Sequence, residues 1–116
     1  MWDVEYTDEF ELWWGSLTEA EQIDVAAVVD LLAERGTNLR FPFTSGIEGS
    51  TLSHMRELRI QHAGYPYRVL YAFDPRRCAI LLLGGNKTGG KRWYEKNVPI
   101  AEKLYQMHLD EIGQED

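Results

Sequence analysis

The hydrophobic positions in the first third of the chain alternate and then recur with helical periodicity. Residues 2–6 alternate apolar and polar side chains, which predicts a short strand. Thr7 suits a helix N-cap, and the apolar positions after it recur every three to four residues. Thr18 and Glu21 have the spacing of a capping box, which predicts a second helix that ends at Gly36. Because only a short connection joins the two predicted helices, we expect them to form an antiparallel hairpin.

The rest of the chain has the pattern of a small sheet followed by a helix. Residues 37–53 are polar and contain glycine and proline, which predicts a loop. Three strands are predicted, over residues 55–61, 65–73 and 78–84. Pro99 suits the first turn of a last helix that begins at Asn97 or Val98. We therefore expect a single α+β domain over residues 1–116, with an antiparallel sheet, an N-terminal helical hairpin and a C-terminal helix, the helices all on one face of the sheet.

The net charge of −7 is unevenly distributed along the sequence. Residues 1–50 hold eleven acidic and two basic side chains, and residues 101–116 hold five acidic and one basic. Residues 51–100 carry nine basic and three acidic side chains. Because phosphate binding requires cations, this middle segment is where a nucleic acid would bind, unless the asymmetry is only an uneven solvated surface.

The composition narrows the class of protein. The single cysteine, Cys78, excludes an internal disulfide, and its apolar neighbours favour a buried side chain. No apolar run approaches the roughly 18 residues of a membrane span, and the first residues lack the features of a signal peptide. Histidine and cysteine nowhere have the spacing of metal ligands. We expect a cytoplasmic protein that needs no metal and no cofactor.

Short motifs follow one another in a specific order along nearly the whole chain. They occupy residues 2–10, 54–59, 67–77, 85–89 and 94–109. Together they resemble the RelE/ParE superfamily, most closely its HigB-like, phage-type branch. The resemblance implies the RelE/ParE-like microbial ribonuclease fold. It also implies the toxin of a type II toxin–antitoxin system, an endoribonuclease that cuts mRNA on the ribosome without a metal and so blocks translation.

The same resemblance implies a set of partners. These are a cognate antitoxin of the HigA-like, helix-turn-helix kind, the ribosome with its mRNA, and operator DNA reached only through the antitoxin, with no membrane. The superfamily also contains ParE-like inhibitors of DNA gyrase and inactive relatives, so a gyrase inhibitor and a degenerate binding module remain alternatives. Thr88 departs from the RelE toxins, which carry an active-site arginine there. An endonuclease should gather its site residues around one phosphate position, whereas a binding protein need not.

The cleavage chemistry implied by the resemblance has three requirements. Attack of a 2′-hydroxyl on the adjacent phosphate needs a base, cations around the phosphorane and an acid at the 5′-oxygen. The catalytic candidates are Arg68, Lys87, Tyr94 and His54. The alternation of its strand predicts that Arg68 projects from an open sheet face. The resemblance implies that Arg68 stabilises the transition state there. The structural alternative is an ion pair with Glu57 or Glu95. The spacing of Lys87 and Tyr94 matches a lysine and the active-site tyrosine of RelE toxins. His54 lies beside the basic strand, and histidine is a side chain that can serve as base or acid near neutral pH.

A second group of residues has the chemistry of RNA binding. The candidates are Arg56, Arg59, Lys91, Arg92 and Trp93. Cations bind phosphates, and an aromatic ring stacks on an unpaired base. Arg56 and Arg59 are three residues apart, so they point to opposite faces of their strand. The alternatives are structural ion pairs with Glu57, a solvated loop, and packing of Trp93 under the last helix.

Overall fold

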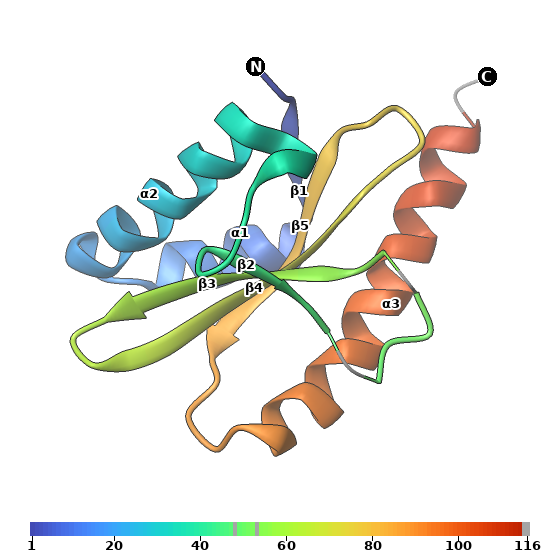
Figure 1. Ribbon diagram of the computed structural model, residues 1–116. Coiled ribbons are helices and arrows are strands. Elements are labelled where there is room, and N and C mark those ends of the chain that lie inside the picture. Colours follow the sequence, from blue (N-terminus) through green and yellow to red (C-terminus); the bar gives the residue numbers. More distant parts are fainter. Residues whose placement is uncertain (48, 53, 115–116) are drawn as a thin grey trace.

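The computed structural model describes residues 1–47, 49–52 and 54–114. Glu48 and Ser53 of the predicted loop, and Glu115 and Asp116 of the predicted domain, lie outside the described residues. The elements are β1 (Val4–Tyr6), α1 (Asp8–Ser16), α2 (Glu19–Arg35), the 3₁₀ turn η1 (Gly36–Asn38), β2 (Thr44–Gly46), β3 (Arg56–His62), β4 (Tyr65–Phe73), β5 (Ala79–Asn86) and α3 (Lys91–Gln114) (Figure 1). The predicted α+β class, with its helical hairpin and C-terminal helix, is confirmed.

The described strands form a sheet in the order β1-β5-β4-β3-β2. β1 runs parallel to β5, and the other neighbouring strands are antiparallel. The sequence does not predict β2, because its three residues are too few to show a periodic pattern. This short strand forms one edge of the sheet and separates two clefts that are described below.

The helical hairpin is held by the caps that the sequence predicts. The Thr7 hydroxyl accepts a hydrogen bond from the Phe10 N–H at 3.0 Å. Thr18 accepts one from the Glu21 N–H at 3.2 Å, while the Glu21 carboxylate accepts one from the Thr18 N–H at 2.8 Å. Gly36 follows α2 with a φ of +55°, a conformation that favours glycine. These bonds satisfy amide groups that a helix start otherwise leaves unpaired.

Helices cover both faces of the sheet, so the expectation that they share one face is wrong (Figure 1). α1 and α2 pack on one face through a core that includes Phe10, Leu32 and Tyr71. α3 packs on the other face, against a core that includes Leu82 and Ala101. Since each face of β4 is covered, both sets of its alternating side chains are buried.

The helix α3 begins at Lys91, earlier than the predicted start at Asn97 or Val98. Pro99 therefore lies inside the helix, where it supplies no N–H to the helical hydrogen bonds. Packing on the sheet explains the early start, because the indole of Trp93 lies against Gly85 in β5. Tertiary contact here outweighs the local signal of the proline.

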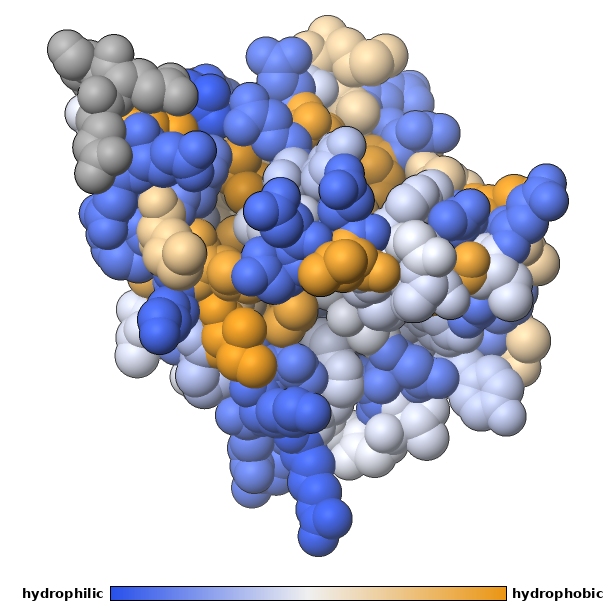
Figure 2. All heavy atoms as spheres, turned by 180° about the vertical axis from the view of Figure 1, so that it is seen from behind, coloured by the Kyte–Doolittle hydropathy of each residue, from blue (hydrophilic) through white to orange (hydrophobic). Residues whose placement is uncertain are grey.

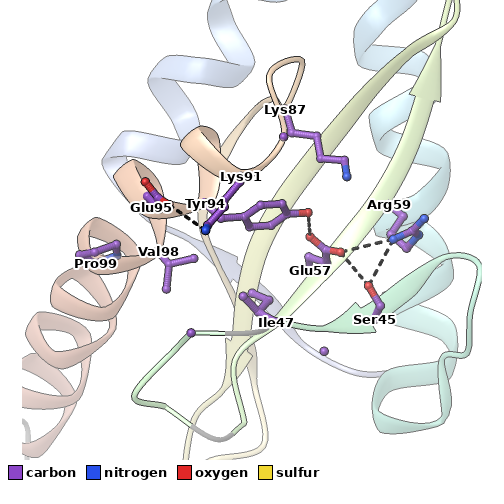
Figure 3. A pocket seen from close by; sticks show the side chains of 13 residues that line it. Ser45, Ile47, Glu57, Arg59, Lys87, Lys91, Tyr94, Glu95, Val98 and Pro99 are labelled. Atoms are coloured by element: carbon purple, nitrogen blue, oxygen red, sulfur yellow. Dashed lines mark hydrogen bonds and ion pairs between the residues drawn. The ribbon is translucent and has the colours of Figure 1, made fainter.

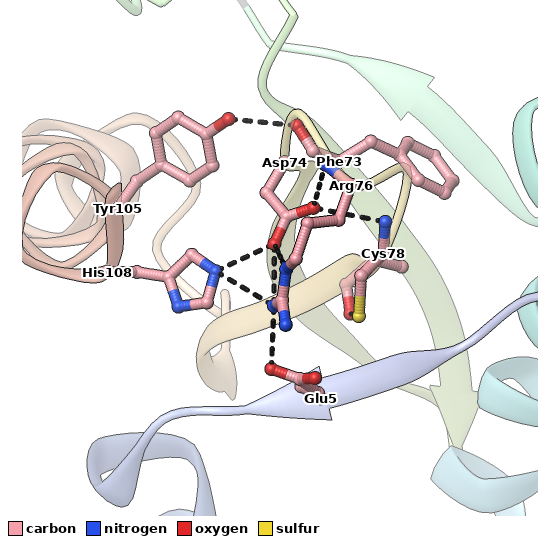
Figure 4. A network of polar contacts seen from close by, with 8 residues as sticks. Glu5, Phe73, Asp74, Arg76, Cys78, Tyr105 and His108 are labelled. Carbon is pink, nitrogen blue, oxygen red and sulfur yellow. Dashed lines mark hydrogen bonds and ion pairs between the residues drawn. The ribbon is translucent and has the colours of Figure 1, made fainter. Parts of the chain in front are cut away.

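A buried carboxylate joins the β4–β5 turn to its neighbours (Figure 4). Asp74 has a fully buried side chain, and its Oδ2 lies 2.7 Å from Nη2 of Arg76 and 2.9 Å from Nε2 of His108 in α3. Nη2 of Arg76 also lies 3.0 Å from Oε1 of Glu5 in β1. The amide of Cys78 donates to Oδ1 of Asp74 at 3.1 Å. Asp74 thus connects the turn to α3, and its partner Arg76 extends the contacts to β1.

The outer surface is mostly polar, with some apolar side chains left exposed. Seen from behind, apolar side chains gather in the middle of the surface among hydrophilic ones (Figure 2). The exposed large apolar side chains of the molecule include Leu12, Ile23, Phe41, Ile100 and Met107. No helix in the described part of the chain combines the length and apolar character needed to cross a membrane.

Candidate functional site

A cleft of about 820 Å³ opens where β2 and β3 face the start of α3 (Figure 3). Its lining includes Ser45 from β2, Glu57 and Arg59 from β3, Lys87 from the β5–α3 loop, and Lys91 and Tyr94 from α3. The cleft therefore collects side chains from segments that are far apart in the sequence. Most of its charged groups come from the basic middle segment of the chain.

The carboxylate of Glu57 lies at the centre of the polar contacts in this cleft (Figure 3). Tyr94 Oη donates to Oε1 of Glu57 at 2.5 Å, and Ser45 Oγ donates to Oε2 at 2.7 Å. Arg59 Nη1 lies 3.4 Å from Oε2, and Arg68 Nε lies 3.6 Å from Oε1. Glu57 is buried, so these partners replace the water that its charge requires.

Arg68 is a buried cation with incomplete hydrogen bonding. It lies on the sheet face that α3 covers and is 3 % exposed, so the predicted projection from an open face is wrong. Its Nη1 donates to the carbonyl of Tyr67 at 2.9 Å, but its Nε has no hydrogen-bond partner among the described residues. A buried donor without a partner is rare, and a functional role is one explanation for it.

The cleft holds more positive than negative charge at its centre. Arg59 and Arg68 lie directly opposite each other on β3 and β4, an arrangement of like charges that is destabilising by itself. Lys87 is the third cation, with Nζ 5.5 Å from the centre of the Tyr94 ring. Glu57 compensates one of these three charges, and the remainder suits an anionic ligand such as a phosphate.

The environment also shifts the pKa values of two side chains in the cleft, Lys87 and Tyr94. Burial, followed by the nearby charge of Arg68, holds the pKa of Lys87 below its ordinary value. Burial and the hydrogen bond to Glu57 raise the pKa of Tyr94 to about 12. At neutral pH Tyr94 is therefore a protonated donor, and Lys87 releases its proton more readily than an exposed lysine does.

Two adjacent glycines in β5 each leave room for a tryptophan of a helix, and Gly85 positions the start of α3. A Cβ atom added to Gly85 would lie 2.6 Å from Nε1 of Trp93, so only a residue without a side chain leaves room for the indole. Gly84 meets Trp13 of α1 in the same way on the other side of the sheet. Because the Trp93 side chain packs on Gly85, the adjacent Tyr94 lies where its hydroxyl contacts Glu57.

Five of the predicted site residues come together and four do not. Arg59, Lys87, Lys91 and Tyr94 line the cleft, and the buried Arg68 contacts Glu57 without being one of the lining residues. His54 and Arg56 instead line a second cleft on the other side of β2, and the His54 ring lies 5.3 Å from that of Tyr105. Arg92 is exposed on α3 and is not among the lining residues, and Trp93 is half-buried against Gly85.

Two residues of the site were not predicted to act there. Glu57 was expected only as an ion-pair partner, and its position as the one acid within a basic strand was the available signal. Ser45 belongs to β2, a strand too short to be predicted, so no sequence signal could have found it. Within residues 1–47, 49–52 and 54–114, His, Cys, Asp and Glu side chains nowhere gather in threes as metal ligands would.

The fold places this protein in the class of proteins that share the RelE-like fold. Free RelE of E. coli, solved as a mutant, superimposes with a TM-score of 0.60 over 81 % of this chain and 92 % of its own, at 9 % identity. The archaeal RelE–RelB complex of Pyrococcus horikoshii contains a chain that matches with a TM-score of 0.54 over 75 % of this chain and 96 % of its own, at 19 % identity. At such low identity, these matches establish the fold alone.

Sequence comparison identifies the family within this class. The family model "Phage derived protein Gp49-like (DUF891)" matches residues 12–106, and the chain belongs to this family. Putative toxin HigB3 of Mycobacterium tuberculosis is 44 % identical over 96 residues, which are 82 % of each chain. Putative toxin HigB2 of the same organism is 34 % identical over 104 residues, 88 % of this chain but 52 % of that relative. The expected resemblance to the HigB-like branch of the RelE superfamily is confirmed.

Proposed function

We propose that this protein is the toxin of a toxin–antitoxin pair and that it cuts mRNA on the ribosome as a metal-independent endoribonuclease. The observation that carries the proposal is a cleft lined by Arg59 and Lys87, in which the buried carboxylate of Glu57 contacts the Tyr94 hydroxyl and the buried Arg68. Such a group of cations stabilises the charge that develops on a phosphate during cleavage. A protein that only binds gyrase does not need this convergence, so the geometry favours the endonuclease over the ParE-like alternative.

The same residues can carry the protons of the reaction. The 2′-oxygen of the RNA attacks the adjacent phosphorus while its proton passes to Oη of Tyr94, and the tyrosine proton passes on to Glu57. The bond from phosphorus to the 5′-oxygen then breaks, and that oxygen takes a proton from Lys87. The products are a 2′,3′-cyclic phosphate and a 5′-hydroxyl. Glu57 acts through Tyr94 in this scheme, as a positioning residue and proton acceptor.

The proposed partners follow from this role. An antitoxin of the HigA-like, helix-turn-helix kind would hold the toxin inactive and connect it to operator DNA. The relative from Pyrococcus horikoshii was solved as a RelE–RelB complex, which supports a protein partner of this type. The ribosome and its mRNA would be the target, which places the activity in the cytoplasm.

The proposal is tested by mapping new RNA 5′ ends in a translating bacterial extract. The wild type is expected to cut within translated codons only when ribosomes are present. Arg68→Ala and Lys87→Gln are each expected to slow the cutting by a factor of about 100 to 1,000, the usual effect of removing one transition-state donor. Lys103→Gln, an exposed lysine elsewhere on α3, is the matched control.

Thermal unfolding of each variant shows whether it has folded, which matters most for the buried Arg68. Cutting that is unchanged in both folded variants would contradict the proposed site. Intact mRNA from a protein that still arrests growth would contradict endonuclease activity and favour gyrase. Intact mRNA without growth arrest would favour a degenerate binding module.

A further inference from the structure

The second cleft lies on the opposite side of β2 and has a volume of about 750 Å³. Its lining includes Arg40, Phe41, Thr44, His54 and Arg56. We infer that this cleft is a second nucleotide subsite, which binds a base and a phosphate of single-stranded RNA next to the nucleotide that reacts at Glu57. The inference rests on the proposed function, because it assumes that RNA is the substrate of the first cleft.

Phe41 is the feature that favours a nucleobase as the ligand. It is 70 % exposed, although a phenylalanine gains by burial. The guanidinium of Arg59 lies over its ring, with Cζ 5.0 Å from the ring centre. An exposed ring backed by a cation is a platform on which an unpaired base stacks, and such stacking contributes about 1 to 3 kcal/mol per base.

The cations of this cleft are available to a ligand. Nε of Arg56 donates to Oγ1 of Thr44 at 3.3 Å, which orients the guanidinium. Neither Arg56 nor Arg40 forms an ion pair with a carboxylate among the described residues. None of the described residues that line the cleft is acidic. In a chain with a net charge of −7, this local excess of positive charge favours a phosphate.

The two clefts are joined across the short edge strand. Ser45 of β2 lines both of them. Arg59 provides a second connection, since it contacts Glu57 in the first cleft and Phe41 in the second. An RNA strand that crosses β2 would therefore place its reacting phosphate near Glu57 and a flanking base on Phe41. Single-stranded RNA fits this path, because only unstacked bases can reach a side-chain platform.

The test compares Phe41→Ala with Phe41→Trp in the Lys87→Gln background, which slows cleavage during the measurement. Binding of fluorescent RNA oligonucleotides of two and six nucleotides is followed by polarisation. Phe41→Ala is expected to weaken the binding of the longer RNA about tenfold, the equivalent of one lost stacking contact, and Phe41→Trp to restore it. Tyr65→Ala is the control, since Tyr65 is also an exposed aromatic residue, at 53 %, and lies outside both clefts.

The cations are tested by the salt dependence of the same binding. Arg40→Gln is expected to reduce the slope of log affinity against log salt by about 0.7, the value for one phosphate contact on a single strand. In the extract, Phe41→Ala with Lys87 intact is expected to need more protein for half-maximal cutting, with the maximal rate unchanged. This split between binding and rate separates a subsite from the catalytic group.

The outcomes distinguish this inference from the proposed function. If Phe41→Ala binds and cuts RNA like the wild type while Arg68→Ala abolishes cutting, the subsite is overturned and the endonuclease stands. If Phe41→Ala retains RNA binding but loses affinity for the purified antitoxin, the cleft is a protein-docking surface and the subsite is likewise overturned. Loss of affinity for the long RNA alone, reversed by tryptophan, supports the subsite.

Discussion

At the scale of single residues, the Tyr94 hydroxyl has the most sharply defined role in the cleft. Its ring is held by α3, and its proton is held by Glu57 at 2.5 Å. Tyr94→Phe keeps the ring and removes only the hydroxyl, so the fold should persist. We expect cutting in the translating extract to fall at least about 100-fold, the usual contribution of one proton-transferring group.

The control for this change is Tyr6→Phe, since Tyr6 is an exposed tyrosine on β1 and does not line the first cleft. Thermal unfolding should show that both variants are folded. Cutting by Tyr94→Phe within a factor of two of the wild type would remove Tyr94 from the mechanism and leave it as a structural partner of Glu57.

Some residues of the candidate site could be selected from the sequence, but their surroundings could not. The resemblance points to Arg68, Lys87 and Tyr94, of which Lys87 and Tyr94 line one cleft and Arg68 contacts Glu57 there. Their environment was not predictable, because the burial of Arg68 depends on where α3 lies. His54 was chosen for its closeness in sequence to the basic strand, but β2 separates the two clefts. That strand has only three residues, too few to show a periodic pattern.

At the scale of elements, the junction of β5 and α3 decides whether the site forms. Gly85→Ala would place a Cβ 2.6 Å from Nε1 of Trp93, a contact that real structures do not tolerate. The indole must move, and the adjacent Tyr94 must move with it. We expect a loss of about 1 to 3 kcal/mol of stability, as for other overpacked sites, together with reduced cutting. Chemical denaturation and the extract assay measure the two effects.

Gly15→Ala is the matched control for this substitution. Gly15 lies in α1 with no atom near its missing side chain, so alanine should stabilise the helix by up to about 1 kcal/mol. If Gly85→Ala leaves both stability and cutting unchanged, the seating of Trp93 on the sheet does not position Tyr94.

The elements themselves could be predicted where local signals were strong. The capping box at Thr18 and the alternation in β3 and β4 located three of the elements, α2, β3 and β4, to within a few residues. The predicted strand ends at Gly84 and leaves Gly85 to a loop, since glycine is common in loops. Both glycines belong to β5 because each seats a tryptophan of another element. Contacts of this kind between distant segments leave no periodic pattern in the sequence.

At the scale of the whole molecule, Asp74 joins the β4–β5 turn to α3 directly and to β1 through Arg76. Burial by itself would raise the pKa of this carboxyl, but hydrogen bonds from His108 and Arg76 outweigh it and hold the pKa below the ordinary 3.8. A carboxyl with a lowered pKa in the folded state stabilises the fold at pH values above its unfolded pKa. That contribution is lost as the pH falls through the folded pKa.

Asp74→Asn should therefore destabilise the protein at pH 7 by about 2 to 3 kcal/mol, because charge-assisted hydrogen bonds from two elements are lost. The difference from the wild type should shrink as the pH falls below about 3.8, where the unfolded carboxyl is already protonated. Thermal unfolding followed by circular dichroism from pH 7 to pH 3 measures both effects. Asp110→Asn, an exposed acid on α3, should change stability little at any pH. A difference between Asp74→Asn and the wild type that stays constant over this range would mean that the asparagine is poorly packed and that the charge of Asp74 does not hold the three elements together.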